Sequence, residues 1–169
     1  MKTLALRRTL GAALLSGAAL TLTTFAATPA EAATVIKVRT VGTTMAVSGT
    51  LGGDALTFSG SGGTVTVTTN IAATVTGGSC TANTATKVTC TGVARVQAVT
   101  GDGNDSITNK AAVPLSSNGG AGSDTLVGGA LNDTLNAGPG VDDVNGGGGR
   151  DTCGGVVNET FTSCEEVTS

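Results

Sequence analysis

Gly119-Gly120-Ala121-Gly122-Ser123-Asp124-Thr125-Leu126-Val127 is the clearest copy of a nine-residue pattern, glycine-glycine-x-glycine-x-aspartate-x-aliphatic-x, that recurs in the second half of the chain. Three copies follow it without a gap, and a fifth precedes it. A flexible Gly/Asp-rich linker would not keep aspartate and aliphatic residues in phase over four consecutive periods. The copies span residues 100–108, 119–127, 128–136, 137–145 and 146–154, and their aspartates are Asp105, Asp124, Asp133, Asp142 and Asp151.

Each part of the repeat has its own physical role. Glycine enters positive-φ conformations that a Cβ penalises, so a tight turn can direct successive carbonyl oxygens inward. The aspartate adds an anionic oxygen to those carbonyls, and together they form the hard ligand set that Ca²⁺ prefers. The last three residues are extended, and strand alternation places the middle one toward a narrow interior. These middle residues are Ile107, Leu126, Leu135, Val144 and Cys153.

One repeat is predicted to form half a coil, so that two consecutive repeats complete one coil. Turns two repeats apart then stack on one edge, which places Asp124 over Asp142 and Asp133 over Asp151. Asp105 precedes Asp124 by two repeat lengths plus one residue, so it shares that edge if the half-coil 109–118 contains the extra residue. That half-coil has no carboxylate, and we expect no metal site on its edge there.

Stacked carboxylates about 4.8 Å apart repel by roughly 1 kcal/mol in water and by about 3–4 kcal/mol at an effective dielectric near 20. A divalent cation between them reverses the sign, so metal binding and folding should be coupled. Only Asp124 has a predicted partner on both sides, whereas Asp151 closes a single pair with Asp133. Leu131 also replaces a turn glycine beside Asp133. The sequence therefore predicts that Asp124→Asn raises the calcium midpoint for folding by more than Asp151→Asn does.

Residues 1–32 have the organisation of an export signal. Lys2, Arg7 and Arg8 precede a moderately apolar stretch, and Ala30-Glu31-Ala32 fits a small-residue cleavage site. The alternative is a retained membrane anchor, which the glycines and threonines in the apolar stretch disfavour. Adjacent Arg7 and Arg8 leave open either general secretion or twin-arginine export. We expect a secreted product that begins after Ala32.

Charge is divided unevenly along that product. Residues 33–99 carry four basic residues and Asp54, a net charge of +3, whereas residues 100–169 carry ten acidic and two basic residues, a net of −8. The acidic half argues against nucleic acid as a partner. The product has two phenylalanines and no tryptophan or tyrosine. A thin solenoid that buries short aliphatic side chains between neighbouring coils suits this inventory.

Four cysteines in an exported chain indicate two disulfides. Three pairings are possible, and proximity favours Cys80–Cys90 and Cys153–Cys164. Each bond would stabilise the fold by roughly 2–3 kcal/mol. The cysteine spacing and the absence of histidine do not suit zinc.

Residues 33–99 are predicted to form short strands separated by small-residue turns. Gly52-Gly53-Asp54 is interpreted as an ordinary turn rather than as a degenerate metal site. Whether this segment continues the solenoid or folds separately is open at this point, although its last strand enters the first repeat without a linker. We expect it to cap one end of the solenoid and residues 155–169 to cap the other, with Glu159, which is out of phase, in a capping role. The predicted strands are 34–41, 44–48, 55–59, 64–69, 72–76, 86–90 and 93–99.

Over about residues 100–154 the repeats resemble the RTX, or haemolysin-type, calcium-binding nonapeptides. The chain also has the export signal and an ending that contains Asp151–Cys153 and Thr162–Glu165. With these features the whole chain looks like a small secreted calcium-binding protein of the actinobacterial kind. The resemblance implies an all-β fold, a right-handed parallel β-roll or β-helix with a β-rich N-terminal capping segment. It also implies that Ca²⁺ is held between stacked turns by backbone carbonyls and by the carboxylates of Asp105, Asp124, Asp133, Asp142 and Asp151.

The leading functional hypothesis is a non-enzymatic, secreted calcium-binding protein with a structural or adhesive role. Two alternatives stay open: a calcium-dependent, lyase-like enzyme acting on polysaccharide, for which Lys110 or Arg150 would supply the basic group, and a surface glycan-binding adhesin. The absence of histidine, tyrosine and tryptophan disfavours the enzyme. The expected partners are calcium ions and an extracellular or cell-surface polysaccharide.

Overall fold

The structure is a computed structural model that describes residues 35–156 and 159–168, in which sixteen β-strands and no helix are assigned. The predicted signal segment 1–32 lies outside the described residues. None of the described residues forms a helix of the length and apolarity that a membrane span requires. The strands are β1 (Ile36–Val41), β2 (Thr44–Ser48), β3 (Ala55–Gly60), β4 (Thr64–Thr69), β5 (Ala73–Gly77), β6 (Cys80–Thr84), β7 (Lys87–Thr91), β8 (Arg95–Asp102), β9 (Ser106–Ala111), β10 (Leu115–Ala121), β11 (Thr125–Gly129), β12 (Thr134–Asn136), β13 (Asp143–Gly147), β14 (Thr152–Gly154), β15 (Thr160–Thr162) and β16 (Glu166–Thr168).

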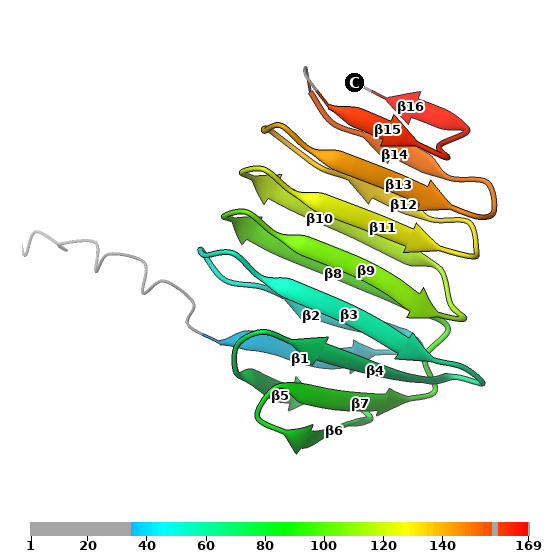
Figure 1. Ribbon diagram of the computed structural model, residues 1–169. Coiled ribbons are helices and arrows are strands. Elements are labelled where there is room, and N and C mark those ends of the chain that lie inside the picture. The colour runs from blue at the N-terminus through cyan, green and yellow to red at the C-terminus, as the bar shows by residue number, and fades with distance from the viewer. Residues whose placement is uncertain (1–34, 157–158, 169) are drawn as a thin grey trace, which may run out of the picture.

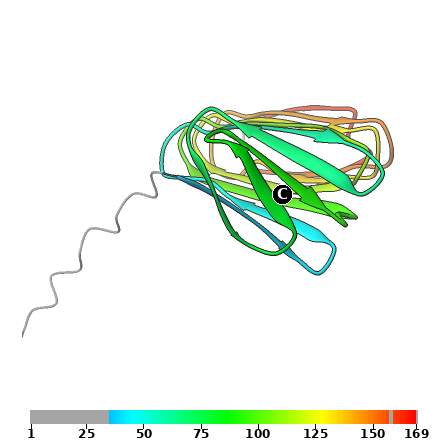
Figure 2. The same cartoon turned by 90° about the horizontal axis from the view of Figure 1, so that it is seen from below.

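The strands form two facing sheets of eight, and the chain alternates between them from β8 onward (Figure 1). The first sheet has the order β16-β14-β12-β10-β8-β2-β1-β5, and the second has the order β15-β13-β11-β9-β3-β4-β7-β6. All neighbours between β8 and β16 pair in parallel. Seen along the stack, the coils form a flattened oval with turns at its two ends (Figure 2). This arrangement is the predicted parallel β-roll.

The predicted register, in which each coil contains two repeats, is confirmed in the repeat block. Leu126 pairs with Val144 and Leu135 with Cys153. The extra residue predicted before the block is also present, because Ile107 pairs with Leu126, one residue beyond two repeat lengths. It is accommodated in the turn after β9, where the Asn109 amide donates to the carbonyl of Val113 at 2.9 Å.

The N-terminal strands extend the same two sheets. β2 pairs in parallel with β8 and β3 with β9, so β2 and β3 make one further coil of the roll. Beyond this coil the sheets become largely antiparallel through β1, β4, β6 and β7, while β5 pairs in parallel with β1. These strands lie at the lower end of Figure 1. They cover the end of the roll that would otherwise expose unpaired backbone groups.

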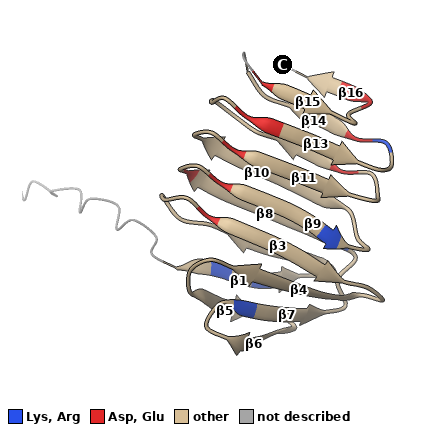
Figure 3. Cartoon of the chain, viewed as in Figure 1, with Lys and Arg blue, Asp and Glu red and all other residues tan. Residues whose placement is uncertain are grey.

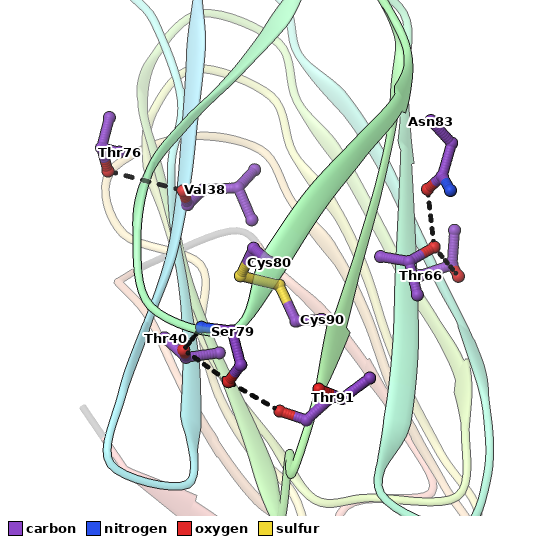
Figure 4. Close-up of a disulfide and its surroundings, with 10 residues drawn as sticks. Val38, Thr40, Thr66, Thr76, Ser79, Cys80, Asn83, Cys90 and Thr91 are labelled. Atoms are coloured by element: carbon purple, nitrogen blue, oxygen red, sulfur yellow. Dashed lines mark hydrogen bonds between the residues drawn. A yellow bond between two sulfur atoms is a disulfide. The ribbon is translucent and has the colours of Figure 1, made fainter.

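Both predicted disulfides are present. Cys80–Cys90 joins the antiparallel pair β6 and β7 beside β1, where Ser79 Oγ donates to the carbonyl of Thr91 at 3.0 Å (Figure 4). Cys153–Cys164 joins β14 to the segment after β15. Strand β6 was not predicted, because Cys80–Thr84 lacks alternating apolar residues, and the disulfide and the edge of β7 hold it in place.

The interior is a narrow row of small apolar side chains. The five predicted middle residues of the repeats are all fully buried, and each faces its counterpart in the next coil. The larger buried side chains are concentrated toward the N-terminal end, where Phe58, Met45 and Ile36 have no exposed surface. The coils of the repeat block therefore bury smaller apolar side chains than the N-terminal strands do. The five middle residues are Ile107, Leu126, Leu135, Val144 and Cys153.

Candidate metal centre

The predicted aspartates lie on the two turn edges of the roll, where Figure 3 shows the acidic residues concentrated. One edge carries Asp105, Asp124 and Asp142, and the other carries Asp133 and Asp151. All five are buried, with at most 3% of their surface exposed. The pairs predicted from spacing are therefore adjacent in the structure.

A ladder of hydrogen bonds connects the aspartates of each edge. The backbone N–H of Asp105 donates to Oδ1 of Asp124 at 2.8 Å, and the N–H of Asp124 donates to Oδ1 of Asp142 at 2.7 Å. On the opposite edge, the N–H of Asp133 donates to Oδ1 of Asp151 at 2.8 Å. Each carboxylate thus fixes the turn that precedes it by one coil, with Oδ1 as the acceptor.

The other carboxylate oxygen of each aspartate is left without a protein partner. Oδ2 is buried and accepts no hydrogen bond in any of the five predicted site residues. A buried, ionised oxygen without a hydrogen-bond partner is costly, so five such atoms in register favour the binding of cations beside them. The residues are Asp105, Asp124, Asp133, Asp142 and Asp151.

Backbone carbonyl oxygens converge on the same positions in the repeats that begin with Gly119, Gly128 and Gly146. A Cβ built on Gly119 would lie 2.2 Å from Oδ2 of Asp124 and 2.8 Å from the carbonyl oxygen of Ala137 in the next coil. A Cβ on Gly128 would lie 2.6 Å from Oδ2 of Asp133 and 2.3 Å from the carbonyl oxygen of Gly146. Because glycine has no side chain, the carboxylate oxygen and the carbonyl oxygen of each pair border one small volume. Carboxylate and carbonyl oxygens so placed fit Ca²⁺.

Two of the five turns have a side chain at this first position. The hydroxyl of Thr100 donates to the carbonyl oxygen of Gly119 at 2.8 Å and lies beside Asp105. In the Asp142 turn the position is taken by Ala137, which is fully buried. The volume beside these two carboxylates is thus partly filled, so we expect Asp105 and Asp142 to hold a cation less well than the other three.

A sixth turn of the same design contains Asp54, which the sequence placed in an ordinary turn rather than in a degenerate metal site. Residues 49–57 form a nonapeptide with Thr50 in the second glycine position, and the N–H of Asp54 donates to Oδ1 of Asp105 at 2.7 Å. Here the carboxylate is satisfied by protein groups, because Thr50 donates its N–H to Oδ2 at 2.6 Å and its hydroxyl to Oδ1 at 3.0 Å. The apolar Leu56, which aligns with Ile107, was the signal that could have revealed it.

Two glutamates of the C-terminal segment take the next positions on the edges. Asp143 pairs with Thr160, so the coil between them is one residue shorter than two repeats. Glu159 therefore lies in register with Asp142, although the sequence places it out of phase with the repeats. Glu159 accepts a hydrogen bond from the N–H of Val156, in keeping with the predicted capping role. On the other edge, Glu165 Oε2 accepts the N–H of Asp151 at 2.6 Å.

Leu131, which replaces a turn glycine, does not disturb the ladder. Its side chain is 39% exposed, and Asp133 both accepts from the N–H of Leu115 at 2.6 Å and donates to Asp151. Its φ is not in the left-handed region, whereas the corresponding Gly122 has a φ of +140°. The backbone therefore takes a different path at this turn while the carboxylate keeps its place.

Burial and neighbouring like charges raise the pKa of Asp105, Asp124 and Asp133. Burial raises the pKa of Asp124 to about 6, and the neighbouring carboxylates of Asp105 and Asp142 act in the same direction. Burial also raises the pKa of Asp133 to about 6, with Asp151 adding to the effect. The pKa of Asp105 is raised for the same first reason. Without a cation, the folded state thus binds protons on these three groups more tightly than the unfolded state does.

This shift predicts that the calcium-free protein is more stable in mild acid. Asp124 and Asp133 have folded pKa values of about 6, above the ordinary value of 3.8. As the pH falls from 6 toward 4 the folded state binds protons before the unfolded state does, so the free energy of unfolding rises. Far-UV circular dichroism of calcium-depleted protein at pH 7.5 and pH 4.5 measures this, because a repeat block that is unfolded at the higher pH should regain β-structure at the lower one. Less β-structure at pH 4.5 than at pH 7.5 would contradict the burial of these charges.

No group of three or more His, Cys, Asp or Glu side chains is placed to share one metal ion within the residues that the structure describes. This agrees with the geometry above, because carbonyl oxygens of stacked turns accompany each carboxylate. Oxygen-only donors on a spacing set by the backbone suit a large, flexible coordination sphere such as that of Ca²⁺ and do not suit soft metals.

The fold and the turns therefore define a parallel β-roll with oxygen-lined cation positions at its edges. Residues 118–153 match the family model of the RTX calcium-binding nonapeptide repeat, in four copies. This segment therefore consists of RTX-type repeats, and repeats of this type bind Ca²⁺. The matched residues are those of the continuous block, whereas the turns at Asp54 and Asp105 and the C-terminal segment lie outside the match. No curated protein and no solved structure matches the chain.

Proposed function

We propose that the protein is a secreted calcium-binding protein whose β-roll folds when it binds calcium outside the cell, and that its role there is structural or adhesive. The ligands are the Oδ2 atoms of the predicted aspartates together with carbonyl oxygens of the stacked turns. Asp124, Asp133 and Asp151 lie beside open positions, whereas Asp105 and Asp142 lie beside partly filled ones. The observation that carries this proposal is the row of buried Oδ2 atoms without hydrogen-bond partners.

Export supplies the change in calcium concentration that this proposal needs. Residues 1–32 have the pattern of a cleaved signal, and two disulfides favour an oxidising compartment. Extracellular calcium-binding modules have dissociation constants of roughly 10⁻⁴–10⁻³ M. Low calcium inside the cell would leave the repeat block unfolded, and higher calcium outside would close it.

Calcium titration of the purified product tests the coupling between binding and folding. Far-UV circular dichroism in chelator should show less β-structure than in millimolar calcium, with a midpoint in the range given above. Magnesium at the same concentration is the control, because it demands near-octahedral geometry and keeps its water ligands. A spectrum that calcium leaves unchanged would remove the folding switch, and calorimetry without binding heat would remove the calcium function.

An adhesive role is supported by the outer face of the first sheet. A depression of about 350 Å³ is lined by Lys37 and Arg39. A second depression, of about 300 Å³, crosses β8, β10 and β12 and is lined by short polar side chains. Within the described strands of this sheet the only acidic residues are Asp102, at the turn end of β8, and Glu166, on the last strand. A basic and hydroxyl-rich face of this kind fits an anionic polysaccharide. The polar residues of the second depression are Gln97, Ser116, Ser117, Asn118, Thr134 and Asn136.

A glycan array with calcium-loaded protein tests the adhesive role. Binding to acidic glycans should be weakened by the double substitution Lys37→Ala and Arg39→Ala and by added salt. Lys87→Ala is the matched control, because Lys87 is exposed on β7 of the other sheet. Equal binding by all variants would exclude this face. Depolymerisation of a uronate polymer by the wild type would replace the adhesive role with an enzymatic one.

A further inference from the structure

We infer that the C-terminal segment completes the calcium site of Asp151: the carbonyl oxygen of Ser163 joins Oδ2 of Asp151, and the carboxylate of Glu165, which accepts the N–H of Asp151, supplies the second negative charge. This site is the last one on the edge of Asp133 and Asp151. It rests on the proposed calcium function and adds ligands from residues that lie beyond the matched repeats.

The first observation is that the oxygen pair of the repeats recurs at the last repeat. A Cβ built on Gly146 would lie 2.1 Å from the carbonyl oxygen of Ser163 and 2.5 Å from Oδ2 of Asp151. The corresponding Cβ on Gly128 would meet the carbonyl oxygen of Gly146 at 2.3 Å and Oδ2 of its own aspartate at 2.6 Å. The non-repeat residue Ser163 therefore supplies the oxygen that the next repeat would supply in a longer roll.

The second observation is the state of Asp151 itself. It has no exposed surface, and its Oδ2 has no hydrogen-bond partner. Its Oδ1 and its N–H are both engaged, by the N–H of Asp133 and by Glu165 Oε2 respectively. Glu165 thus takes the position of the next aspartate in the ladder. Its coil is shorter than two repeats, because Thr152 pairs with Glu166, and the longer glutamate side chain makes up the difference.

The backbone of the segment is held in the conformation that the site requires. Ser163 has a φ of +51° and is the one residue other than glycine with a positive φ within the described part of the chain. The next residue, Cys164, is bonded to the fully buried Cys153. The N–H groups of Glu165 and Glu166 donate to the carbonyl oxygen of Asp151 at 3.1 and 3.0 Å. The disulfide and these hydrogen bonds keep the Ser163 carbonyl against Gly146.

Glu165→Gln tests the site, with Glu166→Gln as the matched control. Glutamine keeps an acceptor for the Asp151 N–H but removes the charge, so a purely structural cap would survive the change. Isothermal titration with calcium should find one ion fewer, or one site weakened at least tenfold, in Glu165→Gln. Glu166→Gln removes the same charge from an exposed neighbour and should bind as the wild type does. Wild-type binding by Glu165→Gln would assign Glu165 to backbone capping alone and overturn the inference.

Asp151→Asn provides an independent variant, because it removes the charge at the proposed ion position and keeps Oδ1 as the acceptor for the Asp133 N–H. It adds no atom between the stacked turns, whereas a Cβ on Gly146 would lie 2.1 Å from the carbonyl oxygen of Ser163. Asp151→Asn should lose the same ion as Glu165→Gln, and a full ion count in this variant would also overturn the inference. If Glu165→Gln fails to fold in calcium, as judged by circular dichroism, Asp151→Asn decides. A wild type that binds no calcium would instead remove the proposed function itself.

Discussion

Replacing Gly122 with alanine should lower the free energy of unfolding of the calcium-loaded protein by about 3–5 kcal/mol, the range of the most damaging single substitutions. Gly122 has a φ of +140°, which side chains rarely adopt, and a Cβ there would lie 1.8 Å from the carbonyl oxygen of Gly103 in the preceding coil. The new methyl group must therefore separate two stacked turns, which would also displace the oxygens beside Asp124. Urea unfolding in millimolar calcium measures the loss.

Gly42→Ala is the control for this substitution. Gly42 also has a positive φ, +58°, but no heavy atom lies within 4 Å of its built Cβ. Its substitution should cost only about 1–2 kcal/mol, the ordinary penalty for a side chain in a left-handed conformation. Equal losses for the two variants would show that backbone conformation alone, and not the close stacking of turns, requires Gly122.

Removal of calcium should divide the chain into a protected N-terminal part and an exchanging C-terminal part. Backbone amides of β11 to β14 are expected to exchange freely in chelator, whereas those of β3, β4 and β7 stay protected. The N-terminal part buries Phe58, Val65, Val67 and Val88 completely and contains the Cys80–Cys90 disulfide. Each half-coil of the repeat block buries one middle apolar residue, which stabilises the fold by about 1.5–3 kcal/mol. Without calcium, the same half-coil also buries one carboxylate oxygen without a partner, which destabilises it.

Hydrogen exchange followed by mass spectrometry distinguishes the possible outcomes, with calcium-loaded protein as the reference. Loss of protection along the whole chain would show that the two parts unfold as one cooperative unit. Unchanged protection in β11 to β14 would show that these coils are stable without calcium. The local difference is expected because stability in stacked repeats is carried by contacts between neighbours.

The periodic part of the molecule could be predicted from the sequence because its information is local. The spacing of the aspartates indicated coils of two repeats and one coil with an extra residue, both confirmed by the pairing of β9, β11 and β13. The disulfide pairings were confirmed as well. The use of Asp105, Asp124, Asp133, Asp142 and Asp151 as calcium ligands stays a prediction.

The ends of the roll could not be predicted in the same way, because there the coil length changes. Asp54 lies 51 residues before its partner Asp105, with a long excursion between them. Glu165 lies 14 residues after Asp151, and side-chain length makes up the difference. The sequence assigned Asp151 one neighbour, and the structure shows two. The basis for expecting a smaller effect of Asp151→Asn than of Asp124→Asn is therefore wrong, and similar effects are now expected.

The half-coil repeat has a consequence for how the molecule can vary in length. Inserting two further repeats between Asn145 and Gly146 would lengthen the roll and leave both ends facing as they do now, because a full coil returns the chain to the same edge. Inserting only one repeat would turn the C-terminal segment to the opposite edge relative to the N-terminal strands. The parity of the repeat number thus sets the relative orientation of the two ends, and natural or designed variants with an odd change would present any end-borne surface on the other side.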